Sequence, residues 1–324
     1  MVVGIPRSLF YYYFFPYWSC VLEELKIPYV VSPPTNQEIL GAGLQAAVDE
    51  ICLPVKIHLG HLAYLAESCD RILSPGYGRW GRRSHFCPKL MGLPDISRSK
   101  FVKTLPLWHD LDDTGRPVTD GWPAALAALA IDVSRRGLER IRLKAWERQR
   151  EFYRLCEDGY TPPEILARFS KAEAPAEPGR GSIRIAVLGH PYLVYDEAAS
   201  HGLLTMLRQA GALIHTEETV PSWAKQLLWP SQKKRVFWRI GQGILSAALY
   251  YTRHKRMDGI IFLSACLCGP DALVGELLER NLAREPAAPP LLKLTVDEHS
   301  GRTGLETRVE AFLDLIDWRR HGKT

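Results

Sequence analysis

The sequence lacks several features that would assign it directly to a class. No uninterrupted apolar run reaches the roughly 18 residues of a membrane span. There is no C-x2-C-x2-C run, no pair of C-x2-C knuckles and no G-x-x-x-x-G-K-[ST] loop. The net charge is only +5, which gives little support to nucleic acid as a partner. These absences disfavour a membrane protein, a zinc-knuckle protein, a P-loop ATPase and a nucleic-acid-binding protein.

The apolar start of the chain imitates a signal peptide, but it lacks a basic leader and contains Pro6, Arg7 and Pro16. Export is therefore not expected. The chain has seven cysteines, an odd number, and cytosolic chains rarely use cysteines as disulfides. We expect a cytoplasmic protein whose cysteines serve as ligands, nucleophiles or core residues.

Short apolar strands alternate with amphipathic helices in two parts of the chain. The first part has the expected strands VVGI, PYVVS and CDRILSP, with helices over residues 19–25 and 36–48. The pattern returns in IRIAVLG, ALIHTEE, DGIIFLS and LLKLTVDEH. It predicts an α/β fold with two parallel-sheet, Rossmann-like lobes. We assign residues 1–120 to the first lobe, 121–180 to a helical connector and linker, and 181–324 to the second lobe.

Turn residues follow most of the expected strands. Arg7 follows the first strand, Thr35 and Asn36 follow the second, and His190 follows the strand that opens the second lobe. Ligands of open α/β sheets bind beyond the carboxyl ends of the strands. We therefore expect these four residues to line a substrate cleft between two facing lobes.

Three further histidines are candidates for chemistry. His299 follows a strand and could transfer protons, with Asp297 or Glu298 setting its pKa, so Glu298 and His299 are the candidate catalytic pair. The alternative is an ordinary strand-to-helix turn. His58 and His61 fall three residues apart on a helix, where packing is favoured over metal binding.

Cys52, Cys87 and Cys268 each come just before a proline or a Gly-Pro pair. Thiolates that converge from separate loops are the usual ligands of a 4Fe-4S cluster. Proline stiffens such a loop, and glycine lets the main chain approach closely. The alternatives are a zinc site and buried cysteines that only fill space.

The remaining cysteines carry a weaker signal. Cys20, Cys69 and Cys156 are expected in the core. Cys266 lies two residues before Cys268 and could be a second ligand, a redox partner or a packed thiol.

The amino-acid sequences of several blocks resemble those of one known family. The blocks are GIPRSLFYYYFFPYW, SPPTNQEIL, DEICLPVKIHLGH, GHPYLVYDE, CGPDAL and DEHSGRTGLETRVEAFLDLI, and they span almost the whole chain. Together they resemble the activase-associated (CoA protein activase) family, which is related to the 2-hydroxyacyl-CoA dehydratases and the double-cubane cluster proteins. The chain departs from the family's usual DEHTGEAG block, because Arg302 stands where an acidic residue is common.

The resemblance implies two flavodoxin-like lobes with an oxygen-sensitive 4Fe-4S cluster held by Cys52, Cys87 and Cys268. It implies that the protein accepts low-potential electrons from an ATP-hydrolysing activator with an actin-like fold and passes them to an acyl-CoA or other small substrate. The enzyme class would be a 2-hydroxyacyl-CoA dehydratase-like lyase or an ATP-dependent reductase component, as a homodimer or heterodimer. The alternative is a non-catalytic cluster carrier or scaffold. No membrane or nucleic-acid partner is expected.

Overall fold

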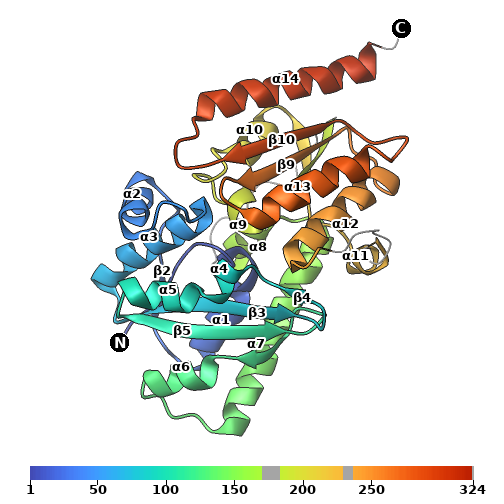
Figure 1. Ribbon diagram of the computed structural model, residues 1–324. Helices are drawn as coiled ribbons and strands as arrows, with labels where there is room; N and C mark the ends of the chain where they lie inside the picture. Colours follow the sequence, from blue (N-terminus) through green and yellow to red (C-terminus); the bar gives the residue numbers. More distant parts are fainter. Residues whose placement is uncertain (170–182, 229–235, 323–324) are drawn as a thin grey trace. The chain divides into compact units, whose positions relative to one another are not determined.

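The computed structural model describes residues 1–169, 183–228 and 236–322 (Figure 1). The chain forms two compact units. Unit 1 contains Met1–Arg154 and Phe237–Ile240, and unit 2 contains Leu155–Val236 and Gly241–Thr324. Each unit has one sheet of mostly parallel strands with helices between them, which confirms the predicted α/β fold. The division at residues 120 and 180 stays a prediction, and residues 170–182 of the expected linker lie outside the described residues.

The sheet of unit 1 has the strand order β2-β1-β3-β5-β6, and the short strand β4 pairs with β3. Its strands are β1 (Val3–Ile5), β2 (Tyr29–Val31), β3 (Arg71–Trp80), β4 (Ser84–His85), β5 (Thr104–Leu111) and β6 (Pro117–Asp120). Strands β2, β1, β3 and β5 are parallel, whereas β4 and β6 are antiparallel to their neighbours.

The sheet of unit 2 is parallel throughout, in the order β10-β9-β7-β8. Its strands are β7 (Ile183–Gly189), β8 (Ala212–Thr216), β9 (Gly259–Ala265) and β10 (Leu291–Val296). In both units the first parallel strand lies between the second and the third, which is the beginning of the flavodoxin-like strand order. The direction of the connections therefore reverses beside β1 in unit 1 and beside β7 in unit 2.

Helices connect the strands in both units (Figure 1). In unit 1 they are α1 (Tyr11–Glu24), α2 (Gln37–Ala46), α3 (Leu53–Ser68), α4 (Pro88–Met91), α5 (Leu93–Lys100), α6 (Trp122–Ala128) and most of α7 (Arg135–Glu157). In unit 2 they are α8 (Pro162–Phe169), α9 (Pro191–Val194), α10 (Leu203–Gln209), α11 (Ser222–Leu228), most of α12 (Arg239–Arg253), α13 (Gly269–Leu282) and α14 (Arg302–His321). Among the described residues, no helix combines the length and the apolar character needed to cross a membrane.

Helix α1 is the aromatic helix of unit 1, and every residue from Tyr11 to Leu22 is buried. A helix that is apolar on all sides is stable only inside a core. Helix α7 packs against it, since the Gln149 side chain donates a hydrogen bond of 2.7 Å to the carbonyl of Tyr13. Ion pairs from α7 to Glu23 and Glu24 join the same two helices.

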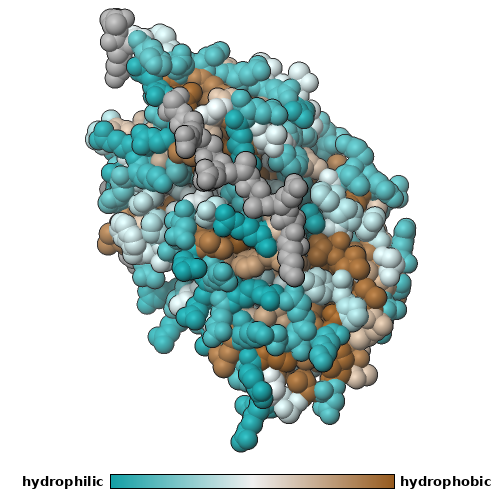
Figure 2. All heavy atoms as spheres, turned by 180° about the vertical axis from the view of Figure 1, so that it is seen from behind, coloured by the Kyte–Doolittle hydropathy of each residue, from teal (hydrophilic) through white to brown (hydrophobic). Residues whose placement is uncertain are grey.

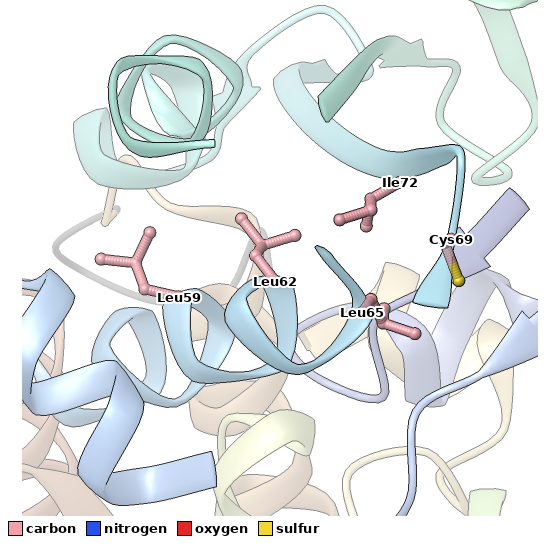
Figure 3. Packing of buried hydrophobic residues seen from close by; sticks show 5 residues of the cluster. All are labelled: Leu59, Leu62, Leu65, Cys69 and Ile72. Atoms are coloured by element: carbon pink, nitrogen blue, oxygen red, sulfur yellow. The ribbon is translucent and has the colours of Figure 1, made fainter. Parts of the chain in front are cut away.

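Helices α2 and α3 approach each other closely because glycines lie at their contact. A Cβ on Gly43 would be 2.1 Å from the Lys56 carbonyl oxygen, and one on Gly60 would be 1.9 Å from that of Ile39. The other side of α3 packs toward β3 through a buried apolar cluster (Figure 3), whose members are Leu59, Leu62, Leu65, Cys69 and Ile72. Helix α3, which begins directly after Cys52, is therefore held on two sides.

The face of the molecule in Figure 2 is mainly hydrophilic, with apolar patches between the polar side chains. Charged residues make up 24% of the chain, and apolar atoms contribute a large share of any protein surface, so scattered apolar patches of this kind need no special explanation.

Candidate metal site

The carboxyl edge of the sheet in unit 2 brings together residues that are far apart in the sequence. Strands β7 and β9 are parallel neighbours, with Gly189 opposite Leu263. His190 directly follows β7, and Asp271 lies in the first turn of α13, which follows β9. This place is the point where the strand order reverses, and ligands of open α/β sheets bind there.

His190, Cys268 and Asp271 form one group at this edge. One ligand atom from each residue lies within 4.8 Å of the other two, a spacing that suits a shared metal ion. The histidine and the carboxylate are both buried, with exposed fractions of 5% and 2%. The group therefore combines nitrogen, sulfur and oxygen donors, and two of its three members are shielded from solvent.

The carboxylate of Asp271 is held by the backbone. Its Oδ2 atom accepts a hydrogen bond of 3.1 Å from the N–H of Ala265, the last residue of β9. Its Oδ1 atom lies 2.7 Å from Nδ1 of His190. The His190 ring stacks on Tyr192, with ring centroids 5.0 Å apart. The positions of both side chains are thus set by the strand ends and by the turns that follow them.

Glycine at position 189, the last residue of β7, allows β7 and β9 to approach each other closely at this edge. A Cβ there would be 2.5 Å from the carbonyl oxygen of Leu263 on the neighbouring strand. In the turn after β9, Leu267 has a φ of +63°, a left-handed conformation that is uncommon for a branched residue. Both backbone features lie next to members of the group.

The three cysteines predicted as cluster ligands share one structural position. Cys52, Cys87 and Cys268 are the N-cap residues of α3, α4 and α13, and each is followed by a proline in the first or second helical position. Proline costs no hydrogen bond there, because the first N–H groups of a helix have no partner within the helix. The positive end of a helix favours a thiolate, and a thiolate is the form that binds metals.

The loops of Cys52 and Cys87 are also linked within unit 1. The Lys89 ammonium, two residues after Cys87, lies 3.5 Å from the carbonyl oxygen of Glu50, two residues before Cys52. Cys268 belongs to unit 2, so the convergence of all three sulfurs on one group stays a prediction. The donor chemistry, three cysteines from three loops, fits an iron-sulfur cluster.

The other four cysteines have different environments. Cys20 and Cys156 are buried within helices, and burial raises the pKa of both thiols, that of Cys156 to well above its ordinary value. Cys69 is the buried C-cap of α3, within the apolar cluster of Figure 3. The core prediction for these three is confirmed. Cys266 is partly exposed beside Cys268.

His58 and His61 are both buried in unit 1, and burial lowers the pKa of each to about 3. The nitrogens of His58 lie 2.9 Å and 3.5 Å from the hydroxyls of Ser8 and Ser97. The nitrogens of His61 lie 2.8 Å and 3.0 Å from the hydroxyls of Ser32 and Thr35. Each of the four ring nitrogens thus has a hydroxyl group as its hydrogen-bond partner, as expected for packed, neutral histidines.

The substrate-binding candidates of unit 1 lie after β1 and β2. The backbone N–H of Arg7 donates to the Ser32 hydroxyl, and its guanidinium lies 5.5 Å from the Tyr11 ring centre. Asn36 is the N-cap of α2, and its side chain accepts a hydrogen bond from Ile39. Thr35 contacts His61, as described above. These contacts account for the local structure, and the substrate role of the three residues stays a prediction.

The candidate catalytic pair Glu298 and His299 follows β10. His299 is exposed, and its backbone N–H donates to the carboxylate of Asp297. Asp297 also accepts a hydrogen bond of 2.8 Å from the Ser300 hydroxyl, which lowers the pKa of its carboxyl. The turn is therefore built around Asp297. A proton-transfer role for Glu298 and His299 stays a prediction.

Sequence reasoning did not identify the pairing of His190 with Asp271, because the CGPD motif indicates only that Asp271 lies near the start of a helix. An aspartate three residues after an N-cap cysteine lies in the first helical turn, where carboxylates are common. It also missed a buried network after β8, in which the Tyr195 hydroxyl donates a short hydrogen bond to Glu218. Burial and the neighbouring Glu217 raise the pKa of Glu218.

The fold and these residues define an α/β protein with two mostly parallel sheets and cysteines at the starts of three helices. Residues 2–220 match the model of the family described as the CoA enzyme activase uncharacterised domain. The chain therefore belongs to this family, as the resemblance predicted. Cys52, Cys87 and His190 lie within the matched residues, whereas Cys268 and Asp271 lie beyond them.

No curated protein matches the chain. Two solved structures are similar over most of its length. One is tagatose-6-phosphate ketose/aldose isomerase from Escherichia coli, at 10% identity, 97% coverage of this chain, 79% of that chain and a TM-score of 0.22. The other is the C-terminal domain of glucosamine-fructose-6-phosphate aminotransferase from Francisella tularensis, at 9% identity. That match covers 98% of this chain and 83% of that chain, with the same TM-score of 0.22. Such low TM-scores support no argument about function.

Proposed function

We propose that the protein is the iron-sulfur component of a CoA enzyme activase-related system, with Cys52, Cys87 and Cys268 as the ligands of a 4Fe-4S cluster. The observation that carries the proposal is the shared N-cap position of these three cysteines, each with a proline close behind. None of the other four cysteines is an N-cap residue of a described helix. A cluster bound there would supply one-electron transfer at low potential.

The chain's own residues would have distinct tasks. The N-terminal amides of α3 and α13 would stabilise the thiolate charges of Cys52 and Cys268. Lys89, held near the Cys52 loop, would add a positive charge close to Cys87. Arg7, Thr35, Asn36 and His190 would bind the substrate, and Glu298 and His299 would move protons.

In this proposal the electron donor is an ATP-hydrolysing activator with an actin-like fold, and the electron acceptor is an acyl-CoA or another small molecule. The family name supports an association with such an enzyme system. The protein would act in the cytoplasm, where such an activator would have its ATP.

A set of single substitutions tests the ligand assignment. Cys52→Ser, Cys87→Ser and Cys268→Ser would each be purified without oxygen and compared with the wild type for iron, sulfide and the EPR signal after dithionite reduction. Cys20→Ala is the matched control, since Cys20 is buried within α1. We expect cluster loss or a changed EPR signal in the three serine variants only. Wild-type spectra and iron content in all three would refute the assignment.

A cluster without turnover of any acyl thioester, even with the activator and ATP present, would favour the non-catalytic carrier over the enzyme. Such a result would leave the ligand assignment intact, because the two functions need the same cysteines.

A further inference from the structure

We propose that His190 is a nitrogen ligand of the metal group that Cys268 binds, and that Asp271 is the positioning residue for its ring. The inference rests on the proposed function, gives His190 a ligand role in place of its substrate-binding role there, and adds a fourth donor that no cysteine supplies. The three residues concerned all belong to unit 2 and lie at the carboxyl edge of a single sheet.

Proximity is the first argument. A nitrogen of His190, the sulfur of Cys268 and an oxygen of Asp271 lie within 4.8 Å of one another. A 4Fe-4S cluster takes four protein ligands, one on each iron, so Cys268 and His190 would bind different irons of one cluster. Because the two side chains already lie close together, small rotations would bring both to one cluster, without movement of the strands.

The second argument is the state of the buried polar atoms. Nδ1 of His190 and Oδ1 of Asp271 are only 2.7 Å apart, yet within the described part of the chain neither has a partner in hydrogen-bond geometry. Buried polar atoms are nearly always paired, and an unpaired one costs about 1–3 kcal/mol. A metal-bound histidine commonly donates its second N–H to a carboxylate, so these two atoms would be paired once the other ring nitrogen binds the metal.

The third argument is that Asp271 is already oriented for this task. The N–H of Ala265 holds its Oδ2 atom, so its Oδ1 atom is directed to the histidine. The stacking of the imidazole on Tyr192 further restricts its rotation. A carboxylate fixed by backbone, next to a histidine fixed by stacking, is the arrangement that orients a ligand ring before the metal binds.

A structural role is the competing explanation. A buried His190–Asp271 pair could simply join β7 to the start of α13. That explanation predicts no contact between the ring nitrogen and the metal group. Spectroscopy on the loaded protein can distinguish the two, because a bound nitrogen has a direct magnetic coupling to the cluster and a distant nitrogen does not.

The experiment uses the full chain, produced with ¹⁵N-labelled histidine and loaded with iron and sulfide without oxygen. After reduction, pulsed EPR would record the hyperfine coupling of nitrogen to the cluster. We expect a ¹⁵N coupling in the wild type and its loss in His190→Asn. His215→Asn is the matched control, because His215 is also buried in unit 2 but lies on β8, and it should keep the coupling.

Asp271→Asn tests the positioning role. This variant should keep its iron but show a changed ¹⁵N coupling, since the ring would lose its anionic partner. An unchanged coupling would remove Asp271 from the proposal.

The outcomes separate the inference from the function on which it rests. A loaded wild-type protein with about four irons and sulfides but no ¹⁵N coupling would overturn the role of His190 and leave the three cysteines as ligands. A wild-type protein that takes up no iron or sulfide would overturn the proposed function itself. The absence of a ¹⁵N coupling in the loaded wild type refutes the inference without any variant, so a variant that fails to fold cannot obscure that result.

Discussion

The close contact between α2 and α3 gives a prediction with a defined size. Gly43→Ala would place a Cβ 2.1 Å from the carbonyl oxygen of Lys56, whereas ordinary contact begins at 3.4 Å. The neighbour is backbone and cannot rotate away, so the two helices must separate. Overpacking of this kind costs up to about 3 kcal/mol, and the better helix propensity of alanine returns about 1 kcal/mol. We expect a net loss of about 2 kcal/mol.

Gly41→Ala is the matched control, because Gly41 lies on the same helix and nothing is within 4 Å of its Cβ position. This variant should be as stable as the wild type or gain up to about 1 kcal/mol. Urea unfolding followed by circular dichroism would compare the two, and Tm should fall by roughly 4–8 °C in Gly43→Ala. Equal stabilities of the two variants would refute the close helix contact.

Three further predictions concern titratable groups. Because burial lowers the pKa of His58 and His61 to about 3, the unfolded chain binds more protons below pH 6.5. The free energy of unfolding should fall as the pH drops from 6.5 toward 3, by about 1.4 kcal/mol per pH unit for each histidine. A urea concentration at the unfolding midpoint that does not change with pH would contradict this. Burial raises the pKa of the Glu218 carboxyl, so ionisation of this group should lower the free energy of unfolding as the pH rises above 4.5. The Glu218→Gln variant should not show this dependence of stability on pH. In metal-free protein, iodoacetamide should label Cys266 faster than buried Cys156 by mass spectrometry, and equal rates would disprove this.

Much of the fold could be predicted from periodicity. The strands expected from VVGI, IRIAVLG and DGIIFLS are β1, β7 and β9, and the helix expected over residues 36–48 is α2. The start of α1 was predicted too late, at residue 19 instead of Tyr11. The reason is physical: a helix buried on all sides has no polar face, so its aromatic run lacks the amphipathic period on which the prediction depends.

The candidate site could be predicted only in part. The prolines after Cys52, Cys87 and Cys268 marked all three loops, because proline near a helix start leaves a local signature. The pairing of His190 with Asp271 could not be predicted, since it depends on β7 and β9 being neighbours in the sheet. Strand order is a long-range property that no local pattern encodes.

The central claim is that three N-cap cysteines bind an iron-sulfur cluster. The most direct test is the content of iron, acid-labile sulfide and zinc in wild-type protein purified without oxygen. The account predicts about four irons and four sulfides per chain, with a signal that appears or changes on dithionite reduction. Zinc alone, or no metal at all in protein kept anaerobic throughout, would contradict it.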